Sequence, residues 1–307
     1  MSAANPRISV VIAARNAADH IGETLASLEA QQDSQQFEVI VVDDGSTDDT
    51  ASIVEETATR DPRFKLYSGP ARGVSAARNQ GFSAVSSKFV LFLDADDLLT
   101  PRALSRLTEK LAAADAVAVF GGVRRISEHG EPLPGADNRT IAPETDTLAA
   151  LLRKNFVVTG GSLAIRADAI RRAGGFDEDL SYGEDWEFWC RLAELGDFGV
   201  LDGEEVLLYR QRATGANFLK KGSPFARRMP CIDKLAANDS LRARLGRDLD
   251  RALRARRIDV FWSKVRSELQ FGDRTRALLV AFGGIAVYPD SLLKPRLALR
   301  LIRSLGR

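Results

Sequence analysis

The sequence predicts an α/β fold in which a mostly parallel central sheet is flanked by helices. Short apolar, β-branched runs alternate with helical segments over the first 120 residues, which is typical of parallel sheets covered on both faces. Polar residues follow three of these runs directly, at Asn16, Asp44 and Asp94–Asp97. Because ligands bind beyond the carboxyl ends of parallel strands, we expect these residues to share one binding rim.

Buried strands are indicated by compact apolar runs, and helices by apolar residues at helical spacing. The expected strands are Ile8–Ala13, Phe37–Val42, Phe64–Tyr67, Phe89–Leu93 and Ala116–Phe120. The expected helices are Ala17–Gln31, Asp49–Thr59, Gly73–Val85 and Pro101–Ala113.

The pattern changes after residue 120. Arg124–Pro143 is rich in Gly, Pro and charge and indicates a hairpin or flap, with a turn at His129-Gly130. Phe156–Ile165 predicts a strand, and its Gly160-Gly161 pair indicates a close backbone approach. Glu184–Leu195 predicts an amphipathic helix, and Val200–Arg210 predicts one or two further strands.

Charge divides the chain into two regions. Residues 224–307 carry 19 Lys and Arg against 8 Asp and Glu, whereas residues 1–223 carry 24 against 34. We therefore expect a domain at 1–223 and a basic, helical region at 224–307. The two cysteines form no disulfide framework, so a cytoplasmic protein is expected. No window reaches the roughly 20 apolar residues of a spanning helix.

The acid cluster Asp94–Asp97 closes a buried strand and admits two interpretations. Oxygen-rich clusters without thiols favour hard divalent cations such as Mg²⁺ or Mn²⁺, held together with substrate phosphates. Alternatively, the cluster is an acidic turn in which Asp97 or Thr100 caps the helix expected from Pro101.

Two further segments have both a binding and a structural interpretation. Asp43–Asp48 is a carboxylate-bearing turn after a strand, suited to contacting a base or ribose, or simply capping the next helix. Arg72–Asn79 opens a helix with Gly and Ser and offers two arginines to a phosphate, or packs as an alanine-rich helix.

Tyr182–Trp189 places two acids at the start of a helix that carries two tryptophans. The acids either complement the helix dipole or supply a general base beside a sugar-sized pocket. Partial desolvation by tryptophan would bring such a base into the neutral pH range.

Together these four segments resemble the family 2 glycosyltransferases of the GT-A fold. The motifs are Val-Val-Asp-Asp-Gly-Ser-Thr-Asp, Gly-Val-Ser-Ala-Ala-Arg-Asn, Leu-Asp-Ala-Asp-Asp and Gly-Glu-Asp-Trp-Glu-Phe-Trp. They occur in the family's order between about residues 7 and 215, and the last 90 or so residues match no motif. The resemblance implies a GT-A, Rossmann-like domain that transfers a sugar with inversion from a nucleotide-diphosphate donor, UDP-linked in most relatives.

The resemblance also implies a role for each motif residue. Asp185 would be the catalytic base, with Glu184 and Trp186 shaping the acceptor side. Asp96 would bind the metal, Mn²⁺ or Mg²⁺, that bridges the donor phosphates. The residues implied in nucleotide-sugar binding are Ala13, Asn16, Asp44, Arg72, Arg78 and Asp94.

Two departures from family patterns sharpen this expectation. Many relatives have a metal-binding histidine where this chain has Arg212, and a guanidinium cannot ligate a cation. Arg212 is therefore expected to neutralise the diphosphate, and the dependence on metal is open. The Gln-x-x-Arg-Trp signature of processive synthases does not follow Asp185, so addition of one sugar to a glycan or lipid-linked acceptor is expected, in cell-surface polysaccharide synthesis.

The basic C-terminal region has two open interpretations. Leucines and arginines recur at helical spacing in residues 292–307, which suits a peripheral helix on the inner face of an anionic membrane. The same pattern suits a helix packed on the catalytic domain or another subunit. A nucleic-acid partner is not expected, since no binding module is recognisable. The alternative to an enzyme is a non-catalytic nucleotide-sugar or glycan binder, or a scaffold protein of a polysaccharide assembly system.

Overall fold

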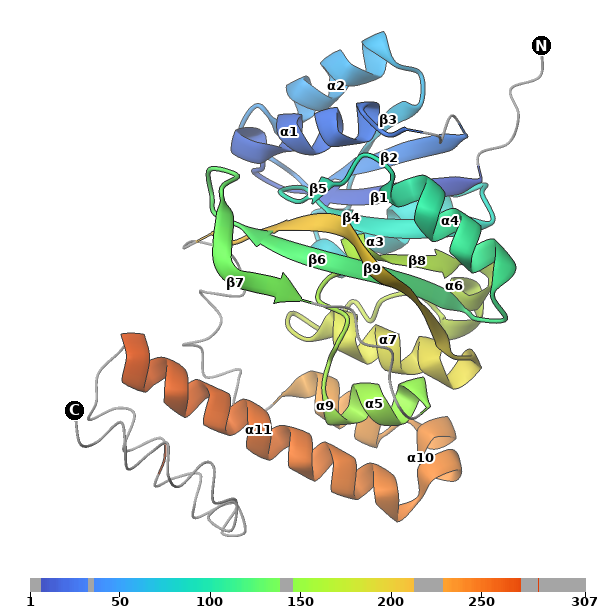
Figure 1. Cartoon of the computed structure of the whole chain (residues 1–307), viewed down its shortest axis with the longest axis vertical. Coiled ribbons are helices and arrows are strands. Elements are labelled where there is room, and N and C mark those ends of the chain that lie inside the picture. Colours follow the sequence, from blue (N-terminus) through green and yellow to red (C-terminus); the bar gives the residue numbers. More distant parts are fainter. Residues whose placement is uncertain (1–6, 33–35, 139–145, 213–228, 272–280, 282–307) are drawn as a thin grey trace. The chain divides into compact units, whose positions relative to one another are not determined.

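The computed structural model describes residues 7–32, 36–138, 146–212, 229–271 and 281 (Figure 1). Its strands are β1 (Ile8–Ala14), β2 (Phe37–Asp43), β3 (Phe64–Ser68), β4 (Phe89–Asp94), β5 (Leu98–Leu99), β6 (Ala118–Ile126), β7 (Pro132–Asn138), β8 (Leu163–Arg166) and β9 (Phe198–Arg210). Its helices are α1 (Ala18–Glu29), α2 (Thr50–Arg60), α3 (Val74–Ser83), α4 (Ala103–Ala113), α5 (Thr147–Arg153), α6 (Ala167–Ala173), α7 (Glu184–Leu195), α9 (Pro230–Ala236), α10 (Asp239–Leu245) and α11 (Arg247–Phe271).

The strands form one sheet in the order β3-β2-β1-β4-β8-β6-β9-β5, with β7 paired to β6. Strands β1 to β4 are parallel, and β8 joins the sheet antiparallel to both β4 and β6. In register, Ala13 of β1 lies between Val42 of β2 and Asp94 of β4. The carboxyl ends of these strands therefore form one rim, as the alternation of strands and helices predicted.

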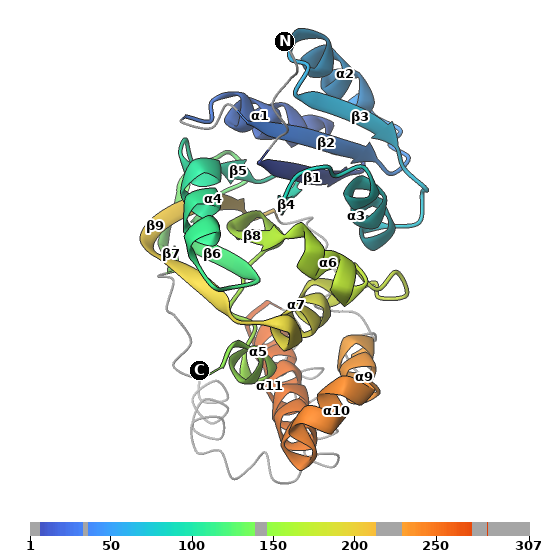
Figure 2. The same cartoon turned by 90° about the vertical axis from the view of Figure 1, so that its right-hand side faces the viewer.

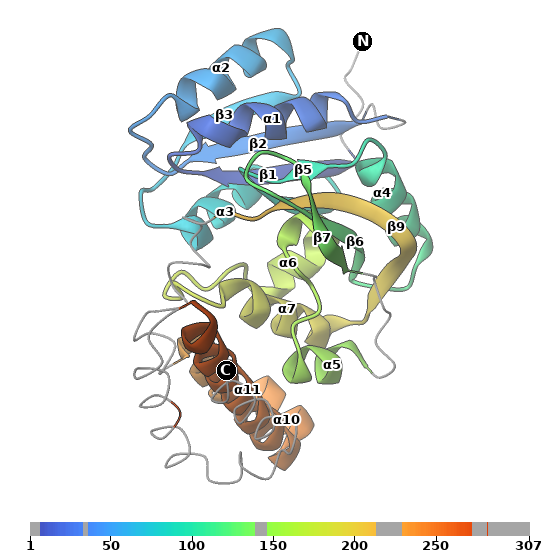
Figure 3. The same cartoon turned by 60° about the vertical axis from the view of Figure 1, so that its left-hand side comes forward.

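Helices cover both faces of the parallel strands. Helices α1 and α2 lie on one face and α3 on the other (Figure 2; Figure 3). Helix α3 approaches closely, because a Cβ added at its Gly81 would lie 2.5 Å from Val11 and 3.2 Å from Val42. The tight contact explains why an alanine-rich segment with a glycine forms this helix.

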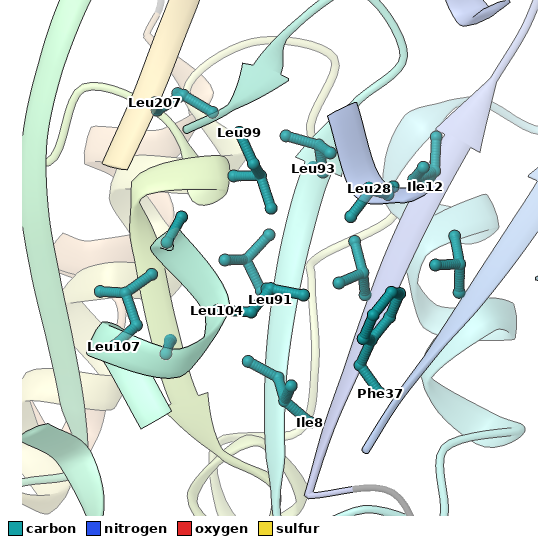
Figure 4. Close-up of a cluster of buried hydrophobic side chains, with 14 of the residues drawn as sticks. Ile8, Ile12, Leu28, Phe37, Leu91, Leu93, Leu99, Leu104, Leu107 and Leu207 are labelled. Atoms are coloured by element: carbon teal, nitrogen blue, oxygen red, sulfur yellow. The ribbon is translucent and has the colours of Figure 1, made fainter. Parts of the chain in front are cut away.

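A core cluster lies on the opposite face of the sheet from α3. Alternate residues of β1, β2 and β4 point into it, among them Ile8, Phe37 and Leu91 (Figure 4). Leu28 of α1 and Leu104 of α4 complete it, so both helices bury their apolar faces against the same strands. This rigid layer fixes the strand ends from which the polar rim projects.

The structure corrects several local expectations. The strand expected at Phe156–Ile165 is shorter, since Gly160–Ser162 form a 3-10 turn before β8. The close approach at Gly160 is confirmed, because a Cβ there would lie 2.8 Å from the carbonyl oxygen of Phe92. Residues 198–210 form one long strand, and the unexpected β5 pairs with it. The hairpin expected within Arg124–Pro143 is present as β6 and β7.

The chain divides into two compact units. The first contains the described residues up to Leu151 and from Asn155 to Arg212, and the second contains Leu152–Lys154 and the described residues from Met229 onward. The boundary expected between residues 223 and 224 lies outside the described residues. So does the amphipathic segment 292–307 that suggested a membrane contact.

The described part of the second unit consists of helices. Helices α9 and α10 both pack against α11, and Leu235, Leu241 and Leu249 are buried among them. An ion pair of 2.6 Å joins Arg257 of α11 to Asp233 of α9. None of the helices in the described part of the chain is long and apolar enough to cross a bilayer.

Candidate active site

The first part of the rim joins the loops that follow β1 and β2. Asn16 adopts the left-handed conformation, with φ of 48°. Its side-chain oxygen accepts a 2.8 Å hydrogen bond from the Thr47 backbone, and its own backbone N–H donates to Ser46 Oγ at 2.9 Å. The Asn16 side chain thus joins the two loops near Ala13, the corner where the family resemblance implies that the nucleoside binds.

Asp44 lies at the base of this corner and is 3% exposed. Its carboxylate accepts hydrogen bonds from the backbone N–H groups of Gly73, at 2.8 Å, and Arg72, at 3.3 Å. Gly73 has φ of 101°, a conformation that turns its N–H toward the carboxylate and that other residues avoid. A carboxylate has about four acceptor positions, so Asp44 keeps capacity for a ligand.

The Arg72 side chain pairs with Glu178, in the loop between α6 and α7, at 3.1 Å. It is largely exposed, so it can swing toward a bound nucleotide without leaving a buried charge behind. The Arg72 backbone lies beside Asp44, to which its N–H donates.

Arg78 connects the donor rim to α7. Its Nη2 donates to Asp94 at 2.7 Å and its Nη1 donates to Asp185 at 2.7 Å. The Arg78 side chain is 5% exposed, and both terminal nitrogens are committed to carboxylates. The structure therefore brings Asp94 and Asp185, which are 91 residues apart in the chain, to one guanidinium.

Asp185 occupies the first turn of α7, next to Gly183, whose φ of 78° starts the helix. Burial raises the pKa of Asp185 to about 6, while the positive charge of Arg78 acts in the opposite direction. The negative charges of Glu184 and Asp94 add to the rise in this pKa. A carboxylate with this pKa is ionised at neutral pH and is basic enough to accept a proton in catalysis.

The aromatic residues around Asp185 are core residues. Trp186 is buried and its indole N–H donates to the Leu151 carbonyl at 2.8 Å. Phe188 and Trp189 pack with Phe176 beneath the start of the helix. They form an apolar floor under this turn of α7, while the Asp185 side chain itself is 31% exposed.

The acids at the end of β4 take their partners from different segments of the chain. Asp94 faces Arg78 and also accepts a hydrogen bond from Thr159 Oγ1 at 3.2 Å. Asp96 pairs with Nε of Arg212 at 2.7 Å. Asp97 is fully buried and accepts a 2.9 Å hydrogen bond from the Arg210 backbone. Within the described part of the chain, no three His, Cys, Asp or Glu side chains are placed to hold a metal ion.

Helix capping does not explain these acids either. Helix α4 begins at Ala103, and no side chain caps it. Asp97 instead binds β9, and the Thr100 hydroxyl donates to the Glu205 carbonyl at 2.8 Å. The capping interpretation is therefore wrong, because both side chains tie the acid loop to the far strand.

The residues present fit a divalent cation in a limited way. Asp96 is partly exposed and lies close enough to Asp94 for its pKa to be raised by burial first and by that neighbour second. One or two carboxylates completed by phosphate oxygens and water suit Mg²⁺ or Mn²⁺. In this structure the positive charge next to Asp96 is the guanidinium of Arg212.

Sequence reasoning missed two residues that hold the site. The Arg210 side chain is fully buried and donates to the carbonyls of Asp96, at 2.9 Å, and Glu128, at 2.6 Å. Thr159 reaches Asp94 from the turn before β8. An arginine ending an apolar strand was the only available signal for Arg210, and Thr159 gave none.

Comparisons with known proteins find a matching family and related structures. The family model described as "Glycosyl transferase family 2" matches residues 9–174. The succinoglycan biosynthesis protein ExoU of Rhizobium meliloti is 30% identical over 210 residues, which cover 64% of this chain and 60% of that protein. This chain thus spans about three fifths of that relative's length.

Solved structures share the fold. TarS from S. aureus in complex with UDP-GlcNAc superposes with a TM-score of 0.66 at 20% identity, covering 93% of this chain and 81% of that one. A mannosyltransferase from Pyrobaculum calidifontis, in complex with GDP-Man and Mn²⁺, superposes with a TM-score of 0.59 at 20% identity, covering 99% of this chain and 87% of that one. Both confirm the α/β fold with a mostly parallel sheet.

Proposed function

The chain belongs to glycosyl transferase family 2, and from that premise we propose that it is an inverting, non-processive glycosyltransferase. It moves one sugar from a nucleotide-diphosphate donor, a UDP-sugar, to a hydroxyl of a glycan or lipid-linked acceptor in polysaccharide synthesis. The observation that carries the proposal is the Arg78 bridge between Asp94 and Asp185. It places an acid of the donor rim and a partly desolvated base on opposite sides of one guanidinium.

The nucleoside end of the donor binds the corner formed by Ala13, Asn16 and Asp44. Asp44 accepts hydrogen bonds from the base through its remaining lone pairs, since its other acceptor positions bind the loop before α3. Arg72 closes over the nucleotide from its exposed position. TarS, which binds UDP and UDP-GlcNAc in its solved structures, supports a uridine nucleotide here.

The diphosphate lies at the Asp94–Asp96 end of the rim. Asp94 faces the ribose and the diphosphate, and Asp96 would hold the divalent cation, Mn²⁺ or Mg²⁺. When bound, the cation stabilises the negative charge that develops on the leaving diphosphate. Arg212 supplies a second positive charge at the same place, so the dependence on metal is expected to be partial.

The chemical step is a single displacement at the anomeric carbon. Asp185 accepts the proton of the acceptor hydroxyl as the new glycosidic bond forms. The bond between the anomeric carbon and the diphosphate oxygen breaks, and its electron pair leaves with UDP. Glu184 shapes the acceptor side, and Trp186 supports it from the core, where its indole N–H binds the Leu151 carbonyl.

The test is turnover across a panel of UDP-, GDP- and dTDP-sugars, with Mn²⁺, Mg²⁺ or EDTA. Wild type is compared with Asp185→Asn and Asp96→Ala. Asp168→Asn, which changes an exposed carboxylate on α6, is the matched control. Turnover of one donor by wild type and by the control, lost in Asp185→Asn, supports the proposal. Binding of a donor without turnover by folded wild type would favour a non-catalytic binder.

A further inference from the structure

Arg78 and its neighbour Asn79 together hold the loop that leads into α7. The Asn79 side chain makes two hydrogen bonds to the backbone of Phe176, donating to its carbonyl at 2.9 Å and accepting from its N–H at 2.8 Å. These two hydrogen bonds hold the loop against α3, because the side-chain amide binds both the N–H and the carbonyl of one residue. Arg78, the residue before Asn79 in α3, binds Asp185 directly.

Gly175 allows the loop to lie close to the Asn79 side chain. It has φ of 73°, and a Cβ at this position would lie 2.6 Å from Asn79 Oδ1. Gly174 beside it also has a positive φ, of 83°, but a Cβ there would meet nothing within 4 Å. An alanine at either position would adopt an unfavourable positive φ, but only an alanine at Gly175 would also crowd Asn79. Comparing the two substitutions therefore isolates the effect of the Asn79 contact.

Phe176 ties the same loop to the sheet. Its ring meets Phe92 of β4 edge to face, with centroids 4.9 Å apart. The Arg78 guanidinium lies 5.1 Å from the centroid of the Phe176 ring. Strand β4, helix α3 and the α7 loop thus form a closed set of contacts around Arg78.

We propose that Arg78 is a positioning residue that holds the Asp185 carboxylate at a fixed place relative to the donor rim, with Asn79 securing the loop behind it. This role differs from direct donor binding, because the Arg78 side chain is only 5% exposed and each of its terminal nitrogens donates to a carboxylate. The inference rests on the proposed function, in which Asp185 is the base.

The charges that face Asp185 explain how Arg78 also sets its ionisation. They are Arg78 from α3, Asp94 from β4 and Glu184 from α7 itself. Burial and the two acids favour the protonated form, and only Arg78 among these three charges favours the ionised base. Removing the charge of Arg78 therefore raises the pKa of Asp185 and leaves less of the base ionised at neutral pH.

The experiment measures kcat, KM for the donor and the acid limb of kcat against pH for Arg78→Gln and Arg78→Lys. The donor is the one that wild type turns over in the panel, starting from UDP-GlcNAc. Arg191→Gln is the matched control, since Arg191 forms a similarly buried ion pair with Glu187 on the same helix without touching Asp185. Thermal unfolding of each variant checks that it is folded.

For Arg78→Gln we expect the acid limb of kcat to move up by about 1 to 3 pH units and kcat at pH 7 to fall at least about 10²-fold. Arg191→Gln should leave the limb in place. Arg78→Lys keeps the charge but cannot bind both carboxylates, so kcat should fall about tenfold with little movement of the limb. If Arg78→Gln does not fold, the kcat and acid limb of Arg78→Lys test the positioning role.

The inference is overturned if Arg78→Gln raises KM for the donor while the acid limb stays at the wild-type position. It is also overturned if Arg191→Gln moves the limb equally, or if kcat of Arg78→Lys equals that of wild type. Failure of wild type to turn over any donor would instead count against the proposed function itself.

Discussion

The two ends of the proposed donor site hold their carboxylates by different means. At the nucleoside end, Asp44 is held by backbone N–H groups of a single loop. At the reaction end, Asp94, Asp96 and Asp185 are each held by an arginine side chain, Arg78 or Arg212. Backbone donors have a fixed direction, whereas an arginine carries charge and links distant segments.

The difference suggests a division of labour. A carboxylate fixed by neutral backbone groups keeps its place and charge and serves recognition. A carboxylate paired with an arginine has a positive charge beside it that favours its ionised form against the effect of burial, which suits proton transfer and phosphate chemistry. Changes at the nucleoside end should therefore alter binding, and changes at the reaction end should alter turnover.

The largest expected effect follows from Asp185→Asn. The amide cannot accept the acceptor's proton, so kcat should fall by about 10²- to 10⁴-fold. Binding of UDP, measured by titration calorimetry, should remain within about threefold of wild type, since Asp185 lies away from the nucleoside corner. A loss of UDP affinity equal to the loss of turnover would break the proposed division.

Asp44→Asn should give the reverse pattern. It removes a buried charge that accepts two backbone hydrogen bonds, and we expect UDP affinity to fall roughly 10- to 100-fold. At saturating donor, kcat should change much less. Asp168→Asn, the exposed control on α6, should change neither quantity. A fall in kcat with unchanged UDP affinity would contradict the assignment of Asp44 to recognition.

Gly175→Ala tests the support of the reaction end. The new Cβ would crowd Asn79, so we expect a lower melting temperature and a lower kcat with little change in UDP affinity. Gly174→Ala is the paired control, because it imposes only the left-handed backbone penalty of roughly 1 to 2 kcal/mol. Equal melting temperatures and equal kcat values in the two variants would show that the Asn79 contact has no influence.

The smallest expected effect concerns Arg212. Partly exposed ion pairs are worth about 0.2 to 1 kcal/mol, so Arg212→Ala should tighten Mn²⁺ binding up to about fivefold. Arg212→His, which adds a ligand, should tighten it further. Calorimetric titration of Mn²⁺ in the presence of UDP measures this. Arg106→Ala, which breaks another partly exposed pair, with Glu204, is the control, and equal affinity in all variants would contradict the prediction.

The contrast between the two ends also explains what could be predicted from the sequence. The strand ends, the Asp44 turn and the close approach at Gly160 follow from local patterns, and the sequence predicted each. The arginine contacts join distant positions, such as Arg78 to Asp185 across 107 residues and Arg210 to Glu23 across 187. No local pattern specifies such a partner, so Arg210 and Thr159 were missed.

The three neighbouring acids after β4 show the same limit. Their spacing suggested one metal cluster, but each carboxylate takes its partner from a different segment: Arg78 of α3, the Arg210 backbone of β9, and Arg212. The two-residue strand β5 follows at once and turns Leu98–Leu99 onto β9. Tertiary pairing, which the local sequence does not reveal, decides where each side chain points.

The most direct test of the central claim is the pH dependence of kcat in wild type and in Asp185→Asn at saturating donor. Since the pKa of Asp185 lies at about 6, wild-type turnover should fall as the pH drops through that value, because the base becomes protonated. The residual rate of Asp185→Asn should show no limb in this range. An acid limb near pH 6 that persists unchanged in Asp185→Asn would contradict the assignment of Asp185 as the base.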